Sequence, residues 1–581
     1  MTFRLLLFIF FLQVGEISSQ SCASAPTQAI RNICLQISSW DNNARSQPAP
    51  APTFAPLASL GPPQSEFDCT TISCICDFLG GTGGENCVLS NGQPYQKVQR
   101  KEFRAMTDNE RQRYVNAMWT ALSNGGYRAL SSIHSSVQLS PGAHSGPAFL
   151  PWHREFLKRM EITLRRIDPT VALPYWDSTL DNRLPNPRDS VMWHPDLMGY
   201  EGSDGQVRTG LFANWPFSDN SRYFRRQRGN GGAMFTPNDI ATVMAQTDPT
   251  QVLANTAPRQ DCPNRAAWSA FEYAHGNPHL WVGGDMLVII TSTNDPLFFS
   301  HHSMVDKIWE DWRLARQTRA ARTIAYPEDD VRCHSQAHFA NNVMQPFSPF
   351  VNRDGLSNDY TDSLYSYAPS PRCAANNING CGSRFLFCDL SHGAAGCAPK
   401  IVIGGNCGGF VNNEDSCYQG VCSNGVCVAG STTTNPPQTS CLNSHYCCPV
   451  YAQNYCNVPN WRNYMTQVCG ASCGFCQGPA QLNGPQCVNF SPYCSAWAAS
   501  GYCSSYSSYM WENCKVSCNA CVFVNVNSRV RYCSGSSALS RAGLAGEPPK
   551  MTLIVDRGDS KKHPEKKTGI SRKKLGWARM M

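Results

Sequence analysis

The chain has little net charge once its last segment is set aside. The formal charge is +7 over 581 residues, but residues 550–581 hold ten Lys and Arg against three Asp and Glu. This excess equals the whole net charge, so the preceding residues sum to zero. A neutral body excludes binding to nucleic acid or to a membrane surface through net charge. We predict a basic disordered tail over 534–581, with a polyanion-binding arm as the alternative.

Long apolar runs are also scarce. The run from Leu5 to Leu12 follows Arg4 and precedes the small residues Ser18 and Ser19, and it is too short to cross a bilayer. This pattern is typical of a secretory signal, so we predict a signal peptide over 1–19 and a secreted, extracellular protein. No other stretch is long and apolar enough for a membrane helix, and we expect no membrane partner.

Cysteine is almost absent from residues 95–370, where only Cys262 and Cys333 occur among the 30 cysteines of the chain. An apolar core rather than disulfides must therefore hold this part together. Residues 107–124 fit such a core, because Thr-Asp-Asn-Glu is a helix start and apolar side chains follow at a spacing of four. The cysteine-rich remainder predicts about fifteen disulfides in an oxidising compartment. Zinc ribbons, the alternative, would need CxxC pairs in an arrangement that the chain lacks.

Histidine is scarce too, with 13 residues, yet six of them form two clusters. The clusters are His134, His144 and His153, and His275, His279 and His302. His153 and His302 each precede apolar residues at helical spacing, and His275 and His279 lie one helical turn apart. A single histidine on an apolar helix face is usually a satisfied core residue, but two clusters of three predict two metal sites.

Sites with three imidazoles per metal suit copper, and also zinc or iron. The zinc protease pattern needs a glutamate directly after its first histidine, where this chain has Gly276. Di-iron bundles use Glu-x-x-His ligands, and no such carboxylate accompanies either cluster. Copper is therefore favoured, since it exchanges electrons with dioxygen and zinc does not. Pro278 lies between His275 and His279, which predicts that His275 is near the first turn of its helix.

Two longer stretches carry a family resemblance. Residues 142–154 (GAHSGPAFLPWHR) and residues 294–309 (NDPLFFSHHSMVDKIW) resemble the two copper signatures of the tyrosinase family of type-3 copper proteins. The resemblance covers roughly residues 95–400 and implies a mainly α fold, with a dinuclear copper site inside a four-helix bundle. It implies that the first histidine cluster binds one copper ion and the second cluster the other, with dioxygen as co-substrate.

The resemblance assigns roles to neighbouring residues as well. His301 matches a residue that supports the site without binding metal, and Asp306 matches one that orients a liganding imidazole. Residues 365–367 (YSY) resemble a tyrosine motif that packs near an early arginine, here Arg100. An ordinary aromatic loop is the alternative for these tyrosines.

Two departures from the family bear on the reaction. Gly142 stands where relatives often carry a cysteine bonded to the middle histidine of the first site, so no thioether can form. Gly276 stands where strong monophenol hydroxylases often carry an asparagine that helps hold a proton-accepting water. Glu272 is a candidate catalytic base in its place, with a structural glutamate as the alternative. The predicted reaction is oxidation of o-diphenols to o-quinones, and hydroxylation of monophenols is less secure.

Two six-cysteine repeats follow the core. Both end in Cys-x3-Cys-x2-Cys, and they resemble ShKT domains at 441–476 and 487–521. The family pairing implies the disulfides Cys441–Cys476, Cys448–Cys469, Cys456–Cys473, Cys487–Cys521, Cys494–Cys514 and Cys503–Cys518. Spacing alone does not choose among the possible pairings. Neither repeat has a lysine between its third and fourth cysteines, so we expect interaction modules rather than channel blockers. Asn489 begins the only glycosylation sequon.

Together these features predict a secreted multidomain oxidase. The expected layout is a signal peptide 1–19, a Cys/Pro-rich segment 20–94, a copper domain 95–400, its disulfide-rich tail 401–430, a linker 431–440, ShKT domains 441–476 and 487–521, and a basic tail 534–581. The expected substrates are small phenols or protein tyrosines, for cross-linking of an extracellular matrix or for pigment. The ShKT domains would bind matrix or protein partners.

Two other functions compete with the oxidase. A hemocyanin-like oxygen-binding protein shares the copper site, but a single copper domain with appended modules argues against it. A catalytically inactive matrix-binding protein is the other alternative, and six intact histidines argue against that.

Overall fold

The structure is a computed structural model that describes residues 21–50 and 63–429, with a few isolated residues between 451 and 518. Contacts divide the chain into two compact units, residues 1–430 and residues 431–581. The predicted signal peptide, the linker 431–440, Asn489 and the basic tail lie outside the described residues. Four of the six ShKT disulfides lie outside them as well.

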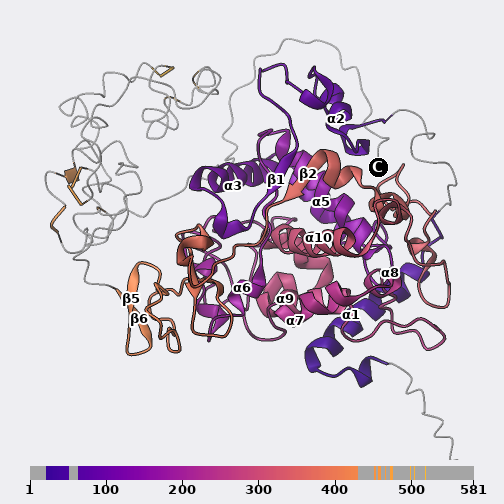
Figure 1. Ribbon diagram of the computed structural model, residues 1–581. Helices are drawn as coiled ribbons and strands as arrows, with labels where there is room; N and C mark the ends of the chain where they lie inside the picture. The colour runs from indigo at the N-terminus through magenta and orange to yellow at the C-terminus, as the bar shows by residue number, and fades with distance from the viewer. Residues whose placement is uncertain are drawn as a thin grey trace, which may run out of the picture. The chain divides into compact units, whose positions relative to one another are not determined.

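The first unit is mainly α, as the sequence predicts. Its helices are α1 (Gln28–Arg45), α2 (Ile72–Phe78), α3 (Asp108–Ser123), α4 (Gly126–His134), α5 (Phe149–Arg165), α6 (Ser178–Asp181), α7 (Pro237–Ala245), α8 (Pro249–Val252), α9 (Phe271–Val282) and α10 (Leu297–Arg316). Helix α5 packs against α3, α4 and α10, and α7 packs against α9 and α10. Figure 1 shows α5 and α10 above α9, with α1 beside α9. Fully buried tryptophans, Trp152, Trp176, Trp193, Trp215, Trp309 and Trp312, fill the core between these helices.

Helix α3 forms where the sequence predicts a helix, and for the predicted reason. The side chain of Thr107 accepts a hydrogen bond from the backbone of Glu110, whose carboxylate accepts one from the backbone of Thr107. This capping box satisfies N–H groups that have no partner in the first turn. Tyr114, Met118 and Leu122 then face the core.

Helix α9 contains Pro278, as the spacing of its histidines implies. His275 is its fifth residue, directly after the first turn and so near it as expected. Proline lacks the N–H that would bond to the carbonyl of Ala274, which weakens the helix locally. The helix nevertheless continues to Val282, because tertiary packing can outweigh such a local cost: all but one of its twelve residues are buried.

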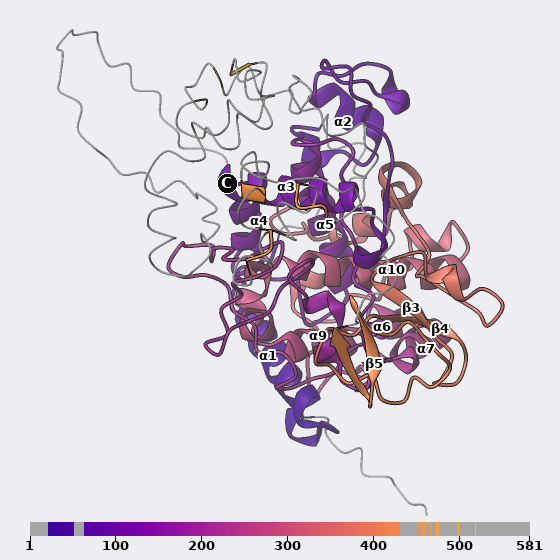
Figure 2. The same cartoon turned by 90° about the vertical axis from the view of Figure 1, so that its left-hand side faces the viewer.

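The strands are short and form pairs. They are the parallel pair β1 (Val98–Arg100) with β2 (Tyr365–Tyr367), and the antiparallel pairs β3 (Leu386–Asp389) with β4 (Gly396–Pro399) and β5 (Gly420–Ser423) with β6 (Val426–Ala429). Figure 2 shows β3 and β4 next to α6, against which β4 packs. The parallel pair joins the two ends of the helical core.

Disulfides are concentrated outside the helical core. In residues 22–427 they are Cys22–Cys34, Cys69–Cys74, Cys76–Cys87, Cys262–Cys333, Cys373–Cys388, Cys381–Cys397, Cys407–Cys422 and Cys417–Cys427. In the second unit the structure forms Cys456–Cys473 and Cys503–Cys518, the third-to-fifth pairs that the ShKT resemblance implies. No helix among the described residues is long and apolar enough to cross a membrane.

Candidate metal centre

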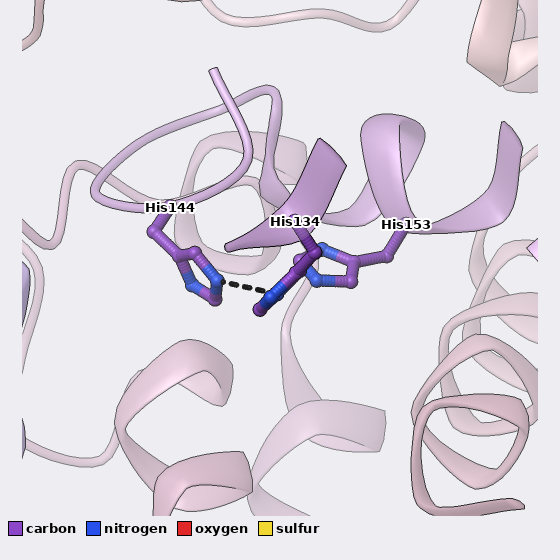
Figure 3. A group of neighbouring side chains, drawn as sticks. All are labelled: His134, His144 and His153. Atoms are coloured by element: carbon purple, nitrogen blue, oxygen red, sulfur yellow. Dashed lines mark hydrogen bonds between the residues drawn. The ribbon is translucent and has the colours of Figure 1, made fainter. Parts of the chain in front are cut away.

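Three histidines of the first cluster converge in the middle of the helices. His134 ends α4, His144 follows in the next loop, and His153 lies in the second turn of α5. Figure 3 shows the ring of His144 turned toward that of His134, and their Nε2 atoms are 3.1 Å apart. Each of the three side chains offers a nitrogen within 4.8 Å of the others, and all three are buried.

The second cluster is built in the same way from α9 and α10. His275 and His279 lie one turn apart on α9, and His302 faces them from α10. The Nε2 atoms of His279 and His302 are 3.1 Å apart, and the nitrogens of all three side chains again lie within 4.8 Å of one another.

The two clusters share one interior. The rings of His153 and His302 are stacked, with centroids 4.4 Å apart and an angle of 11° between their planes. The rings of His144 and His275 are 6.3 Å apart. Two metal ions held by the clusters would therefore be neighbours, as a dinuclear site requires.

Backbone carbonyls set the direction of the rings. The Nδ1 atom of His153 lies 2.9 Å from the carbonyl oxygen of Phe149, and that of His279 lies 3.0 Å from the carbonyl oxygen of Met286. A carbonyl oxygen can only accept, so each Nδ1 must donate and each Nε2 keeps a free lone pair. The Nε2 atom of His153 is buried and has no hydrogen-bond partner, which is the state of a ligand atom ready to bind a metal.

Burial also keeps the imidazoles neutral. It lowers the pKa of His153 and His302 well below the ordinary value, and neighbouring imidazoles lower the pKa of both further. Neutral imidazole is the form that binds a metal. Two adjoining sets of three imidazole nitrogens, without a carboxylate in either set, fit two copper ions.

The loop that carries His144 has an unusual backbone conformation. Ser145 has a φ of 83°, in the left-handed region that non-glycine residues seldom adopt. Its N–H donates a hydrogen bond of 2.9 Å to Oε1 of Glu272, and its hydroxyl lies 3.2 Å from Nε2 of His338. Oε1 of Glu272 also lies 3.3 Å from Nδ1 of His144. Glu272 and His338 together position His144.

These contacts favour the structural alternative for Glu272 over the role of a base. Its second oxygen accepts a hydrogen bond from the hydroxyl of Thr256, so both oxygens are engaged behind His144. The carboxylate is also absent from the wall of the cavity at the metal centre. Sequence reasoning misses His338 altogether, and its spacing of four from His334 is the signal that could have identified it.

His301 lies against the second cluster without joining it. Its Nε2 lies 3.0 Å from the carbonyl oxygen of His275, and the two rings stack at 5.9 Å with an angle of 12°. This position suits a side chain that holds His275 in place.

Among the described residues Asp306 forms no hydrogen bond to a histidine, and its role in orienting a liganding imidazole stays a prediction. Its carboxylate accepts hydrogen bonds of 2.7 Å from the hydroxyls of Tyr365 and Tyr367. It also pairs with Arg154 at 2.7 Å and with Arg100 at 3.4 Å. The Asp306 carboxylate faces Arg100 and Arg154 because buried guanidinium groups need negative partners.

The predicted partnership of Arg100 with the tyrosine motif is confirmed. Arg100 is opposite Tyr367 in the β1–β2 register and donates a hydrogen bond of 2.7 Å to its hydroxyl. The guanidinium carbon lies 3.5 Å from the centre of the Tyr365 ring, a cation–π contact. The tyrosines are therefore part of a buried network rather than of an ordinary loop.

Gly142 is required by the packing of its loop. A Cβ atom at this position would lie 2.8 Å from the carbonyl oxygen of Ala337, closer than real Cβ atoms approach. At this position of the loop, any larger side chain would push the backbone at Gly142 away from that at Ala337.

A small cavity of about 40 Å³ reaches the metal centre. Its wall includes imidazoles of both clusters and the ring of Phe298, which stacks on His302 at 4.1 Å. Helix α1 supplies another part of the wall through Ile33, Gln36 and Ile37.

Comparisons with known proteins agree with this geometry. The family description "Common central domain of tyrosinase" matches residues 124–315, and "ShK domain-like" matches residues 440–476 and 486–521. The chain is 43% identical to tyrosinase-like protein tyr-3 of Caenorhabditis elegans, over 89% of this chain and 90% of that protein. It is 34% identical to a tyrosinase of Streptomyces antibioticus, over 37% of this chain and 82% of that protein. A polyphenol oxidase of Thermothelomyces thermophila matches 48% of this chain and 90% of its own, with a TM-score of 0.38 and 19% identity.

Proposed function

The chain belongs to the tyrosinase family, and from this premise we propose that it is a secreted copper-dependent oxidase that converts o-diphenols to o-quinones with dioxygen. The observation that carries the proposal is the convergence of six buried imidazoles in two adjoining clusters. Two copper ions bound there would supply the electron exchange with dioxygen that side chains alone lack. The chain itself turns Nδ1 of His153, His275 and His279 toward backbone carbonyls and buries all six imidazoles.

The walls of the cavity favour diphenol oxidation over hydroxylation of monophenols. Hydroxylation needs a positioned group that takes the phenolic proton. Among the described residues that line the cavity there is no carboxylate, and Gly276 offers no side chain that could hold a water. In diphenol oxidation two substrate molecules together give four electrons and four protons to one dioxygen, which is reduced to two waters.

Secretion and a matrix role form the wider part of the proposal. Ten disulfides among the described residues suit an oxidising compartment. The two ShK-like domains provide compact surfaces for protein or matrix partners. Small phenols or protein tyrosines near such partners are the proposed substrates, and cross-linking or pigment is the proposed outcome.

The test compares dopa with tyrosine on the copper-loaded full chain, with zinc-loaded protein as the control. We expect oxygen uptake and quinone absorbance with dopa, little reaction with tyrosine, and none with zinc. Brisk hydroxylation of tyrosine would contradict the diphenol preference. A copper-loaded protein that oxidises neither substrate would contradict the oxidase.

Reversible oxygen binding is the second candidate, because the size of the cavity favours it. A volume of about 40 Å³ holds a diatomic molecule, whereas an apolar cavity that binds benzene measures about 150 Å³. Catechol under air distinguishes the two functions: an oxygen carrier would take up and release oxygen with no quinone formed.

A further inference from the structure

Helix α1 covers the metal centre from the outside. It packs along α9, and Figures 1 and 2 both show the two helices side by side. The ring of Trp40 on α1 lies 5.2 Å from the ring of His144, at an angle of 77°. Helix α1, which is far from the histidines in sequence, thus contacts a histidine of the first cluster.

Ile33 makes the closest approach of α1 to the second cluster. A Cβ atom added at Gly276 would lie 2.8 Å from Cδ1 and 2.9 Å from Cγ1 of Ile33. The isoleucine therefore fills the space beside His275 that a side chain at 276 would use. Ile33 is buried, and it lines the cavity together with Gln36 and Ile37.

With α1 in this position the cavity at the metal centre is too small to enclose an aromatic ring. The cavity is several times smaller than the space that benzene occupies in a protein interior. Dioxygen needs no rearrangement to enter, but a phenol does. Some part of the wall must move, and α1 is a part that no disulfide joins to the helices of the two clusters.

The attachment of α1 is non-covalent. Its segment contains only Cys22 and Cys34, and these pair with each other rather than with the core. Gln36 holds α1 to the rim by donating to the carbonyl of Leu287 and accepting from the N–H of Ile289, each at 3.1 Å. Trp40 donates to the carbonyl of Pro141 at 3.2 Å and Arg45 to that of Val331 at 2.7 Å. None of these contacts is a covalent bond, so α1 can shift without breaking one.

We propose that Ile33 is a specificity-determining residue, which on the movable helix α1 excludes aromatic rings from the metal centre until α1 shifts. The inference rests on the proposed phenol oxidation, since it concerns access to the same site. It adds that entry of the substrate, rather than entry of dioxygen, is the restricted step.

The experiment uses the copper-loaded full chain and benzoate, an aromatic probe that is not oxidised. Binding is measured by calorimetry for the wild type, Ile33→Ala, Ile33→Val and Ile30→Ala. Ile30 is the matched control, because it is also a buried isoleucine of α1 in the same apolar cluster but does not line the cavity. We expect benzoate to bind at least about tenfold more tightly to Ile33→Ala, with Ile33→Val between it and the wild type, and Ile30→Ala unchanged.

The kinetics of catechol oxidation give a second readout. We expect Ile33→Ala to lower KM while kcat stays within about twofold, as for a change in access alone. Equal benzoate affinity in the wild type and Ile33→Ala would overturn the inference, as would equal tightening in Ile30→Ala. Tighter benzoate binding without catechol oxidation in any variant would leave Ile33 as the gate residue and refute the oxidase. Catechol oxidation with unchanged benzoate binding would support the oxidase and refute the role of Ile33.

Discussion

The N–H of Ser145 donates a hydrogen bond of 2.9 Å to the carboxylate of Glu272, and this bond fixes the backbone immediately after His144. Ser145 adopts a left-handed conformation that costs free energy, on the order of 1–3 kcal/mol, and persists only because its surroundings enforce it. Glu272 is on α9, beside His275 and His279, whereas His144 belongs to the first cluster. One carboxylate of the second cluster's helix therefore holds a ligand of the first.

Replacement of this carboxylate tests its role. We expect Glu272→Gln to weaken copper binding by the first cluster about 10–100-fold, because removal of a residue that orients a ligand has this effect. Competition with a chelator measures it, and Glu328→Gln, an exposed glutamate, is the control. Unchanged copper affinity with loss of tyrosine hydroxylation would instead identify Glu272 as a base.

The adjacent histidines of α10 provide an internal comparison. We expect His302→Ala to lose one copper ion per chain, since the ring of His302 belongs to the second cluster. His301→Asn should keep both ions with reduced affinity, because His301 only donates to the carbonyl of His275. Metal analysis of both variants decides, and loss of an ion from His301→Asn alone would reverse the assignment.

Gly276 and Ile33 should be coupled in stability. We expect Gly276→Asn to lower the free energy of unfolding by about 1–3 kcal/mol, because the new side chain meets Ile33. Ile33→Ala should relieve this clash, so the double variant loses less than the sum of the single changes. Urea unfolding of the four proteins measures the coupling. Strict additivity would show that the two residues do not compete for space.

Asp306 should matter for stability rather than for metal binding. Asp306→Asn removes one of the two carboxylates paired with each of two buried guanidinium groups, and we expect a loss of about 1–3 kcal/mol in the free energy of unfolding. Asp204→Asn, which breaks an exposed pair with Arg208, is the control and should change little. Copper loss at unchanged stability would support the role in ligand orientation.

His334 should make the stability of the metal-free protein depend on pH. Burial, with a contribution from Arg45, lowers the pKa of His334 to about 4. Below its ordinary pKa near 6.5 the unfolded chain binds a proton that the folded chain does not, so stability falls as pH drops from about 6.5 to about 4 and is unaffected above. This single group accounts for about 3 kcal/mol over that window.

The variant His334→Gln isolates the contribution of His334, because the other buried histidines remain in both proteins. Urea unfolding at several pH values should show a flatter profile for the variant. Parallel profiles for the wild type and the variant would contradict the lowered pKa.

The sequence predicts the features that depend on local spacing. The helices that carry His153 and His302 follow from apolar periodicity, and the helix of His275 and His279 follows from their i, i+4 spacing. The contact of Arg100 with the tyrosine motif follows from a recognised pattern rather than from periodicity. The partners of Asp306 do not follow from either, because side chains 59 and 152 residues away compete for the carboxylate.

Contacts between distant segments are the part that sequence reasoning cannot supply. Ile33 and Gly276 come from two helices with no shared pattern, and only packing of α1 on α9 brings them together. His338 escapes attention because a short 3-10 helix gives no periodic signal. In the sequence, glycine at position 276 in place of the asparagine of strong hydroxylases suggests altered chemistry. The structure adds a steric reason for the glycine, because Ile33 occupies the space that a side chain at 276 would need.

The pairing of β1 with β2 brings together two points of the chain that enclose helices α3 to α10. Arg100 and Tyr367 are 267 residues apart in sequence yet hydrogen-bonded. Chain that precedes the first strand and chain that follows the second therefore enter and leave at one place. In evolution, flanking modules can be gained, lost or exchanged at this junction while the helices that hold the histidines keep their order and packing.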